Sequence, residues 1–450
     1  MLRVAIVGSG PAAFYAAGAL LASEDPPVEV DMIERLPTPW GLVRLGVAPD
    51  HPQLKTVSRA FEKIAARPGF RFLGNVEVGR DVSHDELVPL YDAVLYAVGS
   101  QTDRRLGIPG EDLPGSWAAT ELVAWYNGHP DFQHLEFDLA HERAVVVGNG
   151  NVALDVARML VLTQHELAPT DTTDEAIAAI VMCGIREIVI LGRRGPVQAA
   201  WTSTELGELG ELEGADVVVD PAELALDPVS AAELEGASNV VQRNMEILRE
   251  LAARPLSGKP RQVRLRFATS PVAILGQERV EGVEVVRNRL EPDGRGSVRA
   301  VATQEREVIP CGIVFRSVGY RGVGVPGVPF DDGAGVIANI DGRVRDGADA
   351  IPGVYCAGWI KRGPTGVIGT NKKDATETVE LLLEDARAGR LAGRGDGTLD
   401  ELLAARGVEV VMYGGWERID ALERARGEAE GRPRVKLTSW DELLAAARSA

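Results

Sequence analysis

A glycine-rich turn near the N-terminus has the residue types and spacing that bind a phosphorylated ligand. It reads Gly8-x-Gly10-x-x-Ala13 and stands between an apolar run, residues 4–7, and a run with helical character. In such a unit Gly8 permits the tight turn, Gly10 lets backbone N–H groups approach a pyrophosphate, and the small Ala13 lets the helix pack on the strand. The phosphates then lie at the positive end of the helix dipole. The pattern predicts a dinucleotide site, although a purely structural turn would carry the same glycines.

An acidic residue follows this turn at the distance expected for nucleotide recognition. The strand-like run "VEVDMIE" ends in Glu34, 21 residues after Ala13. A carboxylate at this point accepts hydrogen bonds from the two hydroxyls of an adenosine ribose. The strand before the turn and the acid after it therefore favour an adenine-dinucleotide site over a structural turn.

A second unit of the same design, "RAVVVGNGNVALDVARML", contains Gly148-x-Gly150-x-x-Ala153. Its next clear strand ends in Arg193 and Arg194 instead of an acid. A carboxylate would repel a ribose 2′-phosphate, whereas guanidinium groups hold it with paired hydrogen bonds. The second site is therefore predicted to prefer NADP to NAD. The alternative is that the arginine pair is only a solvated strand end.

Length and the order of these units predict the fold. A chain of 450 residues exceeds what one hydrophobic core usually supports, and two nucleotide sites indicate one tightly held flavin and one exchangeable nicotinamide. The runs "YDAVLYAVGS" and "CGIVFRSVGY" mark the crossings between domains. We predict an α/β protein with two Rossmann-like, three-layer dinucleotide-binding domains. A discontinuous FAD domain of residues 1–102 and 320–450 receives an inserted NADP domain of residues 103–319, and a polar tail from about residue 386 packs on the FAD domain.

The second unit has one irregularity of spacing. Gly150 and the arginine pair are separated by about twice the usual ~20 residues. We therefore expect an insertion around residues 162–179 that is looped out onto the surface.

Charge and cysteine content exclude several other classes of protein. Asp and Glu outnumber Lys and Arg by 66 to 48, and a net charge of −18 argues against a general binder of nucleic acids or anionic membranes. Cys183, Cys311 and Cys356 lie far apart, without a CxxC pair, a metal-like grouping or an iron–sulfur ligand set. No run of about 20 apolar residues looks membrane-spanning, and a strand–glycine–helix unit explains the apolar N-terminal run better than a signal peptide does. A bacterial cytoplasmic location is expected.

The stretch "PTPWGLVRLGVAPDHPQLK", residues 37–55, contains four prolines and can form neither a long helix nor a central strand. It is therefore an ordered functional loop or a disordered linker. Together with "GNGNVALDVAR", "GRRGPVQAAWT" and "GWIKRGPTGVIGTNKKDA", it resembles the adrenodoxin-reductase-like ferredoxin–NADP reductases of the glutathione-reductase superfamily. The resemblance extends over nearly all of the chain, and it implies that residues 37–55 wrap the flavin.

The resemblance also implies roles for individual residues. Besides Gly8, Gly10 and Ala13, the residues expected to contact FAD are Ala12, Glu34, Leu42, Val82, Trp359, Gly366, Val367 and Ile368. Those expected to contact NADP are Asn149, Gly150, Asn151, Val152, Arg193, Arg194 and Glu205. His51, Asp155 and Glu208 match the polar residues that the family places near the nicotinamide and the proton path. From the residues alone, His51 is better explained as a loop residue that fixes a turn, and Asp155 could complement its helix dipole.

Two features depart from the common pattern. Gly358-Trp359 stands where the wider superfamily commonly has a Gly-Asp pair that holds the flavin ribitol, and adrenodoxin-type reductases share this tryptophan. In "TSTELGELGELEG", Gly207 and Gly210 occupy expected helical positions, at a cost of about 1 kcal/mol each relative to alanine.

The reaction implied by the resemblance is that of a ferredoxin–NADP reductase. NADPH delivers a hydride to the flavin, which passes single electrons to the iron–sulfur cluster of a ferredoxin. Two alternatives remain open at this point: an NADPH-dependent flavin diaphorase or reductase of a small organic acceptor, and an electron-relay subunit of a larger complex. The lack of additional cysteines counts against the relay.

An acidic ferredoxin would need a basic docking face on this acidic chain. Residues 241–267 contain seven bases, Arg243, Arg249, Arg254, Lys259, Arg261, Arg264 and Arg266, against two acids, Glu246 and Glu250. Lys361, Arg362, Lys372 and Lys373 are expected near the flavin. Transient, salt-sensitive docking at these bases is the prediction, and an ordinary solvated helix and strand is the alternative.

Overall fold

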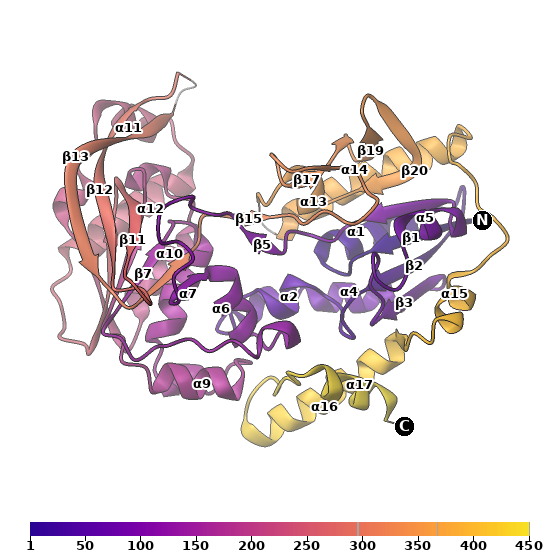
Figure 1. Cartoon of the computed structure of the whole chain (residues 1–450), viewed down its shortest axis with the longest axis horizontal. Coiled ribbons are helices and arrows are strands. Elements are labelled where there is room, and N and C mark those ends of the chain that lie inside the picture. Colours follow the sequence, from indigo (N-terminus) through magenta and orange to yellow (C-terminus); the bar gives the residue numbers. More distant parts are fainter. Residues whose placement is uncertain (295–296, 367, 450) are drawn as a thin grey trace. The chain divides into compact units, whose positions relative to one another are not determined.

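The computed structural model describes residues 1–294, 297–366 and 368–449. The chain divides into two compact units (Figure 1). The first comprises Met1–Thr102, Asn127–Asp131 and Tyr320–Ala450, and the second comprises Asp103–Tyr126 and Phe132–Gly319. The sequence carries no signal that groups Asn127–Asp131 with the first unit. Within the described residues, no helix combines the length and the apolar character needed to cross a membrane.

An eight-stranded sheet forms the middle layer of the first unit. Its strands are β1 (Leu2–Val7), β2 (Val28–Glu34), β3 (Phe70–Gly74), β4 (Ala93–Tyr96), β18 (Asn339–Ile340), β19 (Arg343–Asp346), β20 (Asp349–Cys356) and β21 (Val411–Met412). They lie in the order β18-β19-β20-β4-β1-β2-β3-β21. The five strands from β20 to β3 are parallel, whereas β19 is antiparallel to β20 and the edge strands β18 and β21 are antiparallel to β19 and β3.

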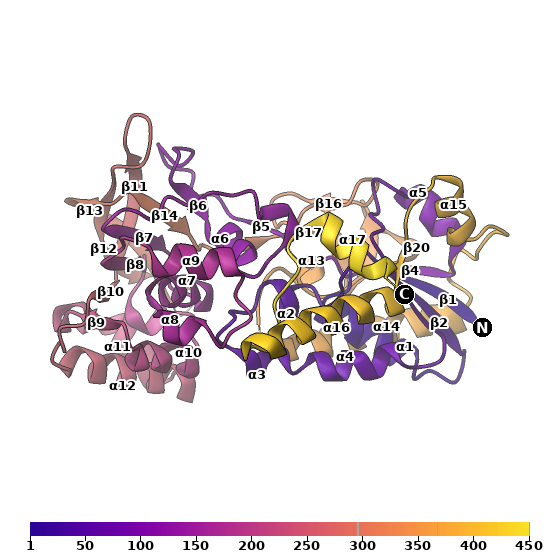
Figure 2. The ribbon, with the colours of Figure 1, turned by 90° about the horizontal axis from the view of Figure 1, so that it is seen from below.

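Helices cover both faces of this sheet, which explains why β1 is apolar from Val4 to Val7. Val4 and Ile6 face one core, to which α1 (Pro11–Leu20), α4 (Ser58–Ala65), α14 (Ile368–Arg387), α16 (Tyr413–Glu430) and α17 (Trp440–Arg448) contribute. Ala5 and Val7 face the other core, with α5 (His84–Leu87) and α15 (Leu399–Ala405). The helices α16 and α17 lie side by side in both views (Figures 1 and 2). The polar tail is thus part of the first unit.

A buried carboxylate holds the end of α14 to the sheet. Asp385 accepts hydrogen bonds from Arg343 Nε (2.6 Å), Tyr355 OH (2.8 Å) and Arg390 Nε (2.7 Å). The Arg343 hydrogen bond is the main reason why the pKa of Asp385 falls from 3.8 to about 2.

Asp385→Asn is therefore expected to destabilise the protein in a pH-dependent way. A carboxylate whose folded pKa is depressed stabilises the fold above its ordinary pKa, and that contribution is lost as pH falls through the folded value. At pH 7 the variant should lose about 2 kcal/mol of unfolding free energy, and the deficit should shrink toward pH 2. Urea denaturation at pH 7, 4 and 2.5 measures it, and a deficit that does not change with pH would contradict the prediction.

The second unit is built on a six-stranded, fully parallel sheet. Its strands are β6 (Ser116–Ala118), β7 (Arg143–Val147), β8 (Glu187–Leu191), β9 (Ala215–Val219), β10 (Arg261–Arg266) and β14 (Ile313–Arg316), in the order β6-β14-β7-β8-β10-β9. On one face Val146 and Ile188 pack in a core with α6 (Ala119–Tyr126), α7 (Asn151–Val161), α9 (Asp174–Val181), α10 (Ser203–Glu208) and α12 (Asn239–Ala253). On the other face Val145 and Val189 pack on the antiparallel strands β11 (Thr269–Leu275), β12 (Gly282–Pro292) and β13 (Val298–Pro310). The eight-stranded sheet has five parallel strands and the six-stranded sheet is fully parallel. Each sheet is covered on both faces, which confirms the predicted three-layer α/β class.

The prediction that residues 162–179 are looped out onto the surface is wrong, because they form helices that pack on the core of the second unit. Residues 162–179 contain α8 (Gln164–Leu167) and most of α9. Leu167, Ala176 and Ile180 are fully buried in the core beside α7. The extra residues between the second glycine turn and the arginine pair therefore add a packed helix, because the apolar positions of "EAIAAIV" form a buried face.

Candidate functional site

The first glycine turn connects β1 to α1. Gly8 has φ +105°, and a Cβ added there would stand 2.5 Å from the carbonyl oxygen of Ala97 in the loop after β4. Gly10 has φ −78°, and a Cβ added there would meet no atom of the described residues within 4 Å. Gly10 precedes α1 and offers no side chain that could cap its N–H groups. Gly8 is thus required by the turn, whereas open space at an uncapped helix N-terminus fits a bound pyrophosphate.

Glu34 ends β2 beside this turn. Its carboxylate accepts hydrogen bonds from Ser9 Oγ (2.6 Å) and from the backbone N–H of Leu36 (3.0 Å). Burial raises the pKa of Glu34, and these hydrogen bonds oppose the rise. The hydroxyls of a ribose would add donors to the same carboxylate and further favour its ionised form.

Two distant segments meet the start of α1. Residues 37–55 form an ordered loop, in which the backbone N–H of Trp40 donates to Ser9 O (3.0 Å) and a Cβ on Gly41 would stand 3.1 Å from Gly10 Cα. Gly358, after β20, has φ +78°, and its Cβ would stand 2.6 Å from that of Ala12. The loop and the "GWI" segment are therefore adjacent to the glycine turn, and the linker alternative is wrong.

The other residues expected around a flavin lie on the same unit. Leu42 opens α2 (Leu42–Leu45), His51 is buried directly before α3 (Pro52–Lys55), and Val82 is fully buried. Trp359 opens α13 (Trp359–Arg362), and within the described residues its indole Nε1 is buried without a hydrogen-bond partner. Gly366 precedes α14, Ile368 is its first residue, and Val367 lies outside the described residues. The open glycine, the uncapped helix and the unpartnered indole N–H fit a bound FAD.

The second glycine turn repeats this geometry between β7 and α7. Gly148 has φ +133°, and its Cβ would stand 2.0 Å from Ser317 O. Gly150 has φ −106°, leaves α7 without a side-chain cap, and its Cβ would meet no described atom within 4 Å. Asn151, the first residue of α7, accepts a hydrogen bond from the backbone N–H of Thr202 at 3.0 Å, and Val152 packs against the core of the unit. This second helix N-terminus also fits a pyrophosphate.

The arginine pair follows β8 after one intervening residue, Gly192. The backbone carbonyls of Arg193 and Arg194 accept hydrogen bonds from Asn288 Nδ2 (2.8 Å) and Ala268 N (2.9 Å), which fix the backbone of the pair. Within the described ranges neither guanidinium has a hydrogen bond or an ion pair. Asn149, in the glycine turn, has a buried side-chain Nδ2 that also finds no partner there. Two unpaired guanidiniums and a spare amide donor fit a phosphorylated ribose.

Three predicted acids converge on one arginine that sequence reasoning missed. Arg158 is 3% exposed, and its guanidinium contacts Asp155 Oδ1 (2.9 Å), Glu205 Oε2 (3.1 Å) and Glu208 Oε2 (3.2 Å). The available signal was the spacing of three residues between Asp155 and Arg158, which places both on one face of α7. Arg158 offsets the charge that would otherwise make burial of these carboxylates costly.

The helix that carries Glu205 and Glu208 is shorter than expected. α10 ends at Glu208, and a 3-10 turn follows at Leu209–Glu211. Only Gly207 is therefore inside the α-helix. Gly210 instead accepts a hydrogen bond from Arg254 Nη1 (2.6 Å) at its carbonyl.

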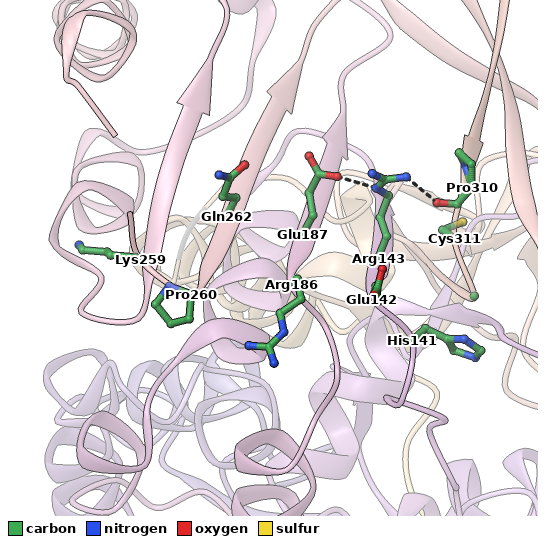
Figure 3. A pocket seen from close by; sticks show the side chains of 11 residues that line it. His141, Glu142, Arg143, Arg186, Glu187, Lys259, Pro260, Gln262, Pro310 and Cys311 are labelled. Carbon is green, nitrogen blue, oxygen red and sulfur yellow. Dashed lines mark hydrogen bonds and ion pairs between the residues drawn. The ribbon is translucent and has the colours of Figure 1, made fainter. Parts of the chain in front are cut away.

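A polar pocket of about 500 Å³ lies at the amino ends of β7, β8 and β10 in the six-stranded sheet of the second unit. Its lining residues are His141, Glu142, Arg143, Arg186, Glu187, Lys259, Pro260, Gln262, Pro310, Cys311 and Gly312. Figure 3 shows Arg143 between Glu187 and Pro310, to whose oxygens it donates at 2.5 and 3.0 Å. Because nucleotides bind at the carboxyl ends of parallel strands, this pocket is separate from the glycine turn.

The bases counted between residues 241 and 267 are largely engaged by their neighbours. Arg243 pairs with Glu246 (2.9 Å) and Glu250 (3.3 Å). The remaining engaged bases donate to carboxylates or backbone carbonyls; they are Arg254, Lys259, Arg261, Arg264 and Arg266. Arg249 alone has no partner within the described residues. This pairing favours the alternative of an ordinary solvated helix and strand.

Comparison with known proteins agrees with this architecture. Residues 2–182 match the family model of pyridine nucleotide-disulphide oxidoreductases, the class that the parallel sheets and paired glycine turns define. The chain is 52% identical over 453 residues to NADPH-ferredoxin reductase FprA of Mycobacterium tuberculosis, covering 98% of each chain. It is 42% identical over 462 residues to the mitochondrial NADPH:adrenodoxin oxidoreductase of Arabidopsis thaliana, covering 99% of this chain and 95% of that protein. The solved structure of M. tuberculosis FprA in complex with NADPH matches with a TM-score of 0.94 and 52% identity over the whole of both chains.

The relatives identify one family within the class of pyridine nucleotide-disulphide oxidoreductases. The chain belongs to the adrenodoxin-reductase-like NADPH–ferredoxin reductases.

Proposed function

We propose that this chain is an FAD-dependent ferredoxin–NADP reductase. The main support is a pair of helix N-termini, at Gly10 and Gly150, where an added Cβ would meet no described atom within 4 Å. Glu34 follows the first of them along the chain, and Arg193 and Arg194 follow the second. An acid suits ribose hydroxyls and paired guanidiniums suit a 2′-phosphate, so the two sites take different nucleotides. The identity to NADPH–ferredoxin reductases along the whole chain supports the same reaction.

The first unit is the FAD domain in this proposal. Glu34 binds the adenosine ribose, the N–H groups of α1 bind the pyrophosphate, and residues 37–55 with Trp359 enclose the flavin. FAD, when bound, accepts a hydride from NADPH and releases the electrons singly, which no side chain here can do. His51 is buried in the same loop, and in this proposal it lies near the flavin and helps to exclude water.

The second unit is the NADP domain. The N-terminus of α7 binds the pyrophosphate, the Asn149 amide supplies a further donor, and the arginine pair holds the 2′-phosphate. Asp155, Glu205 and Glu208 are held in place by Arg158. Glu208 retains 31% of its side-chain exposure, so it is the carboxylate of this group best placed to exchange a proton with water.

Ferredoxin is the proposed electron acceptor, and most of the bases predicted to dock it already contact carboxylates or carbonyl groups within the described residues. Lys361 and Arg362 both contact Asp374, and Lys373 lies 3.7 Å from Glu377. Arg249 and Lys372 are exposed, and their side-chain charges have no hydrogen-bond or ion-pair partner within the described part of the chain. We propose that Lys372, on the first unit, contributes to a weak, salt-sensitive contact with an acidic ferredoxin. The cytoplasmic location stays a prediction.

Anaerobic stopped-flow spectroscopy tests the reaction. NADPH should bleach the flavin band near 450 nm rapidly and NADH slowly. Oxidised ferredoxin should then restore the band, with a rate that falls as ionic strength rises. If only quinones or dyes restored it, the nucleotide assignments would stand and the diaphorase alternative would replace the ferredoxin reductase. A purified protein that takes up no FAD would refute the proposal.

A further inference from the structure

The loop of residues 37–55 has two sides with different neighbours. Its backbone at Trp40 and Gly41 contacts the first glycine turn. Trp40 and Arg44 are buried, with 4% and 5% of their surface exposed. The side chains of both residues contact α16. The loop therefore lies between the proposed pyrophosphate site and the C-terminal hairpin, α16 and α17.

The contact with α16 is specific in geometry. The indole rings of Trp40 and Trp416 pack edge to face, with centroids 4.8 Å apart and planes at 77°. The Arg44 guanidinium lies 5.2 Å from the centroid of the Trp416 ring. It also donates two parallel hydrogen bonds to Glu423, from Nη1 at 2.8 Å and Nη2 at 2.5 Å. A planar, two-point contact fixes orientation as well as distance.

Glu423 is fully buried and joins several segments. Besides the two bonds from Arg44, it accepts hydrogen bonds from Arg434 Nη1 (3.0 Å) and from the backbone N–H of Leu437 (2.9 Å). Burial by itself would raise the pKa of Glu423, but Arg44 and Arg434 bring it below its ordinary value. The carboxylate is therefore ionised at neutral pH, and four donors hold it at the junction of the loop, α16 and the connection to α17.

The loop needs such support because part of its backbone is unfavourable. Trp40 has φ +85° and Gly41 has φ +51°. A non-glycine residue with positive φ persists only where its surroundings hold it there. The side chains of Trp40 and Arg44 contact α16, while the adjoining backbone approaches Gly10. A shift of α16 would thus be passed directly to the atoms beside the pyrophosphate site.

We propose that Trp416 and Glu423 are positioning residues for FAD, which hold residues 37–55 in their flavin-binding conformation from the C-terminal hairpin. The inference rests on the proposed function, since it takes the first unit to be the FAD site. In this proposal the polar tail does not contact FAD itself. It acts on the cofactor indirectly, through Trp40 and Arg44 of the loop.

The test compares two buried carboxylates in the holoprotein. Glu423→Gln keeps the shape of the side chain and removes its charge, and Asp385→Asn does the same to a buried, ion-paired acid at the far end of α14. Flavin dissociation is followed at 25 °C by fluorescence after dilution, and unfolding by circular dichroism. Because a broken buried ion pair strongly perturbs its neighbours, Glu423→Gln should release FAD about tenfold faster or more. Asp385→Asn should lower the unfolding temperature but leave FAD release within about twofold of the parent.

Each outcome decides between the two claims. A parent protein that binds no FAD would remove the proposed function. A parent that binds FAD normally, with Glu423→Gln releasing it at the parent rate or both variants releasing it equally fast, would overturn only the positioning role. If Glu423→Gln does not fold, Arg44→Lys is measured instead, since it keeps the charge but loses one of the two parallel bonds. Unchanged FAD release from Arg44→Lys would likewise refute the inference.

Discussion

Replacing both Arg193 and Arg194 by alanine is expected to raise the KM for NADPH about 100-fold or more, because each hydrogen bond to a charged group contributes about 1.5–3 kcal/mol. Turnover with saturating NADPH should change little, since the 2′-phosphate is remote from the nicotinamide. The KM for NADH, which lacks that phosphate, should stay within about twofold. Steady-state assays with both nucleotides and an artificial acceptor give these constants.

The matched control lies at the other end of the same strand. Arg186 directly precedes β8, and Arg193 lies two residues beyond the end of that strand. Arg186 is exposed. Arg186→Ala removes a positive charge from the same unit, so it shows the effect of charge alone. One contrary result is that Arg186→Ala raises the KM for NADPH as much as the double substitution does, and another is that the double substitution raises the KM for NADH as much as that for NADPH. Either result would show that Arg193 and Arg194 do not bind the 2′-phosphate.

The parts of the site that follow from local backbone geometry are those that sequence could predict. A glycine turn between a buried strand and a helix imposes the same constraints wherever it occurs: Gly8 must adopt positive φ against Ala97, and Gly148 must do so against Ser317. The spacing of residues along the chain records these constraints directly. Glu34 and the arginine pair could be located in the same way, because Glu34 ends β2 and the pair lies just beyond the end of β8, each on the strand next to its turn.

Contacts between distant segments leave no comparable trace. Arg44 and Glu423 are 379 positions apart, and nothing in either local pattern shows that one binds the other. The i, i+3 spacing of Asp155 and Arg158 could indicate that pair, but nothing in the local sequence shows that Glu205 and Glu208 contact the same arginine. The bases near residue 250 show the opposite error, since a charge count sums residues whose carboxylate partners, such as Glu187 for Arg264, lie elsewhere in the chain. Burial and pairing decide whether a charge is available, and both are tertiary properties.

Gly10→Ala should weaken FAD binding by about 10- to 100-fold while leaving the fold intact, because an extra methyl group in a filled site costs about 1–3 kcal/mol. The backbone of Gly10 has φ −78°, which alanine adopts freely, and the new Cβ would meet no described atom within 4 Å. Only a molecule bound over the N-terminus of α1 would collide with it. Flavin retention after gel filtration and the FAD dissociation constant measure the loss, and circular dichroism of the flavin-free protein checks the fold.

Gly8→Ala supplies the contrast two residues away. At φ +105° and with a Cβ only 2.5 Å from Ala97 O, this substitution should destabilise the flavin-free protein itself by more than about 1 kcal/mol. The two neighbours thus separate a glycine required by the chain from a glycine required by its ligand. Normal FAD affinity in Gly10→Ala, in a protein whose parent binds FAD, would show that the pyrophosphate does not approach this residue and that the cofactor lies elsewhere on the first unit.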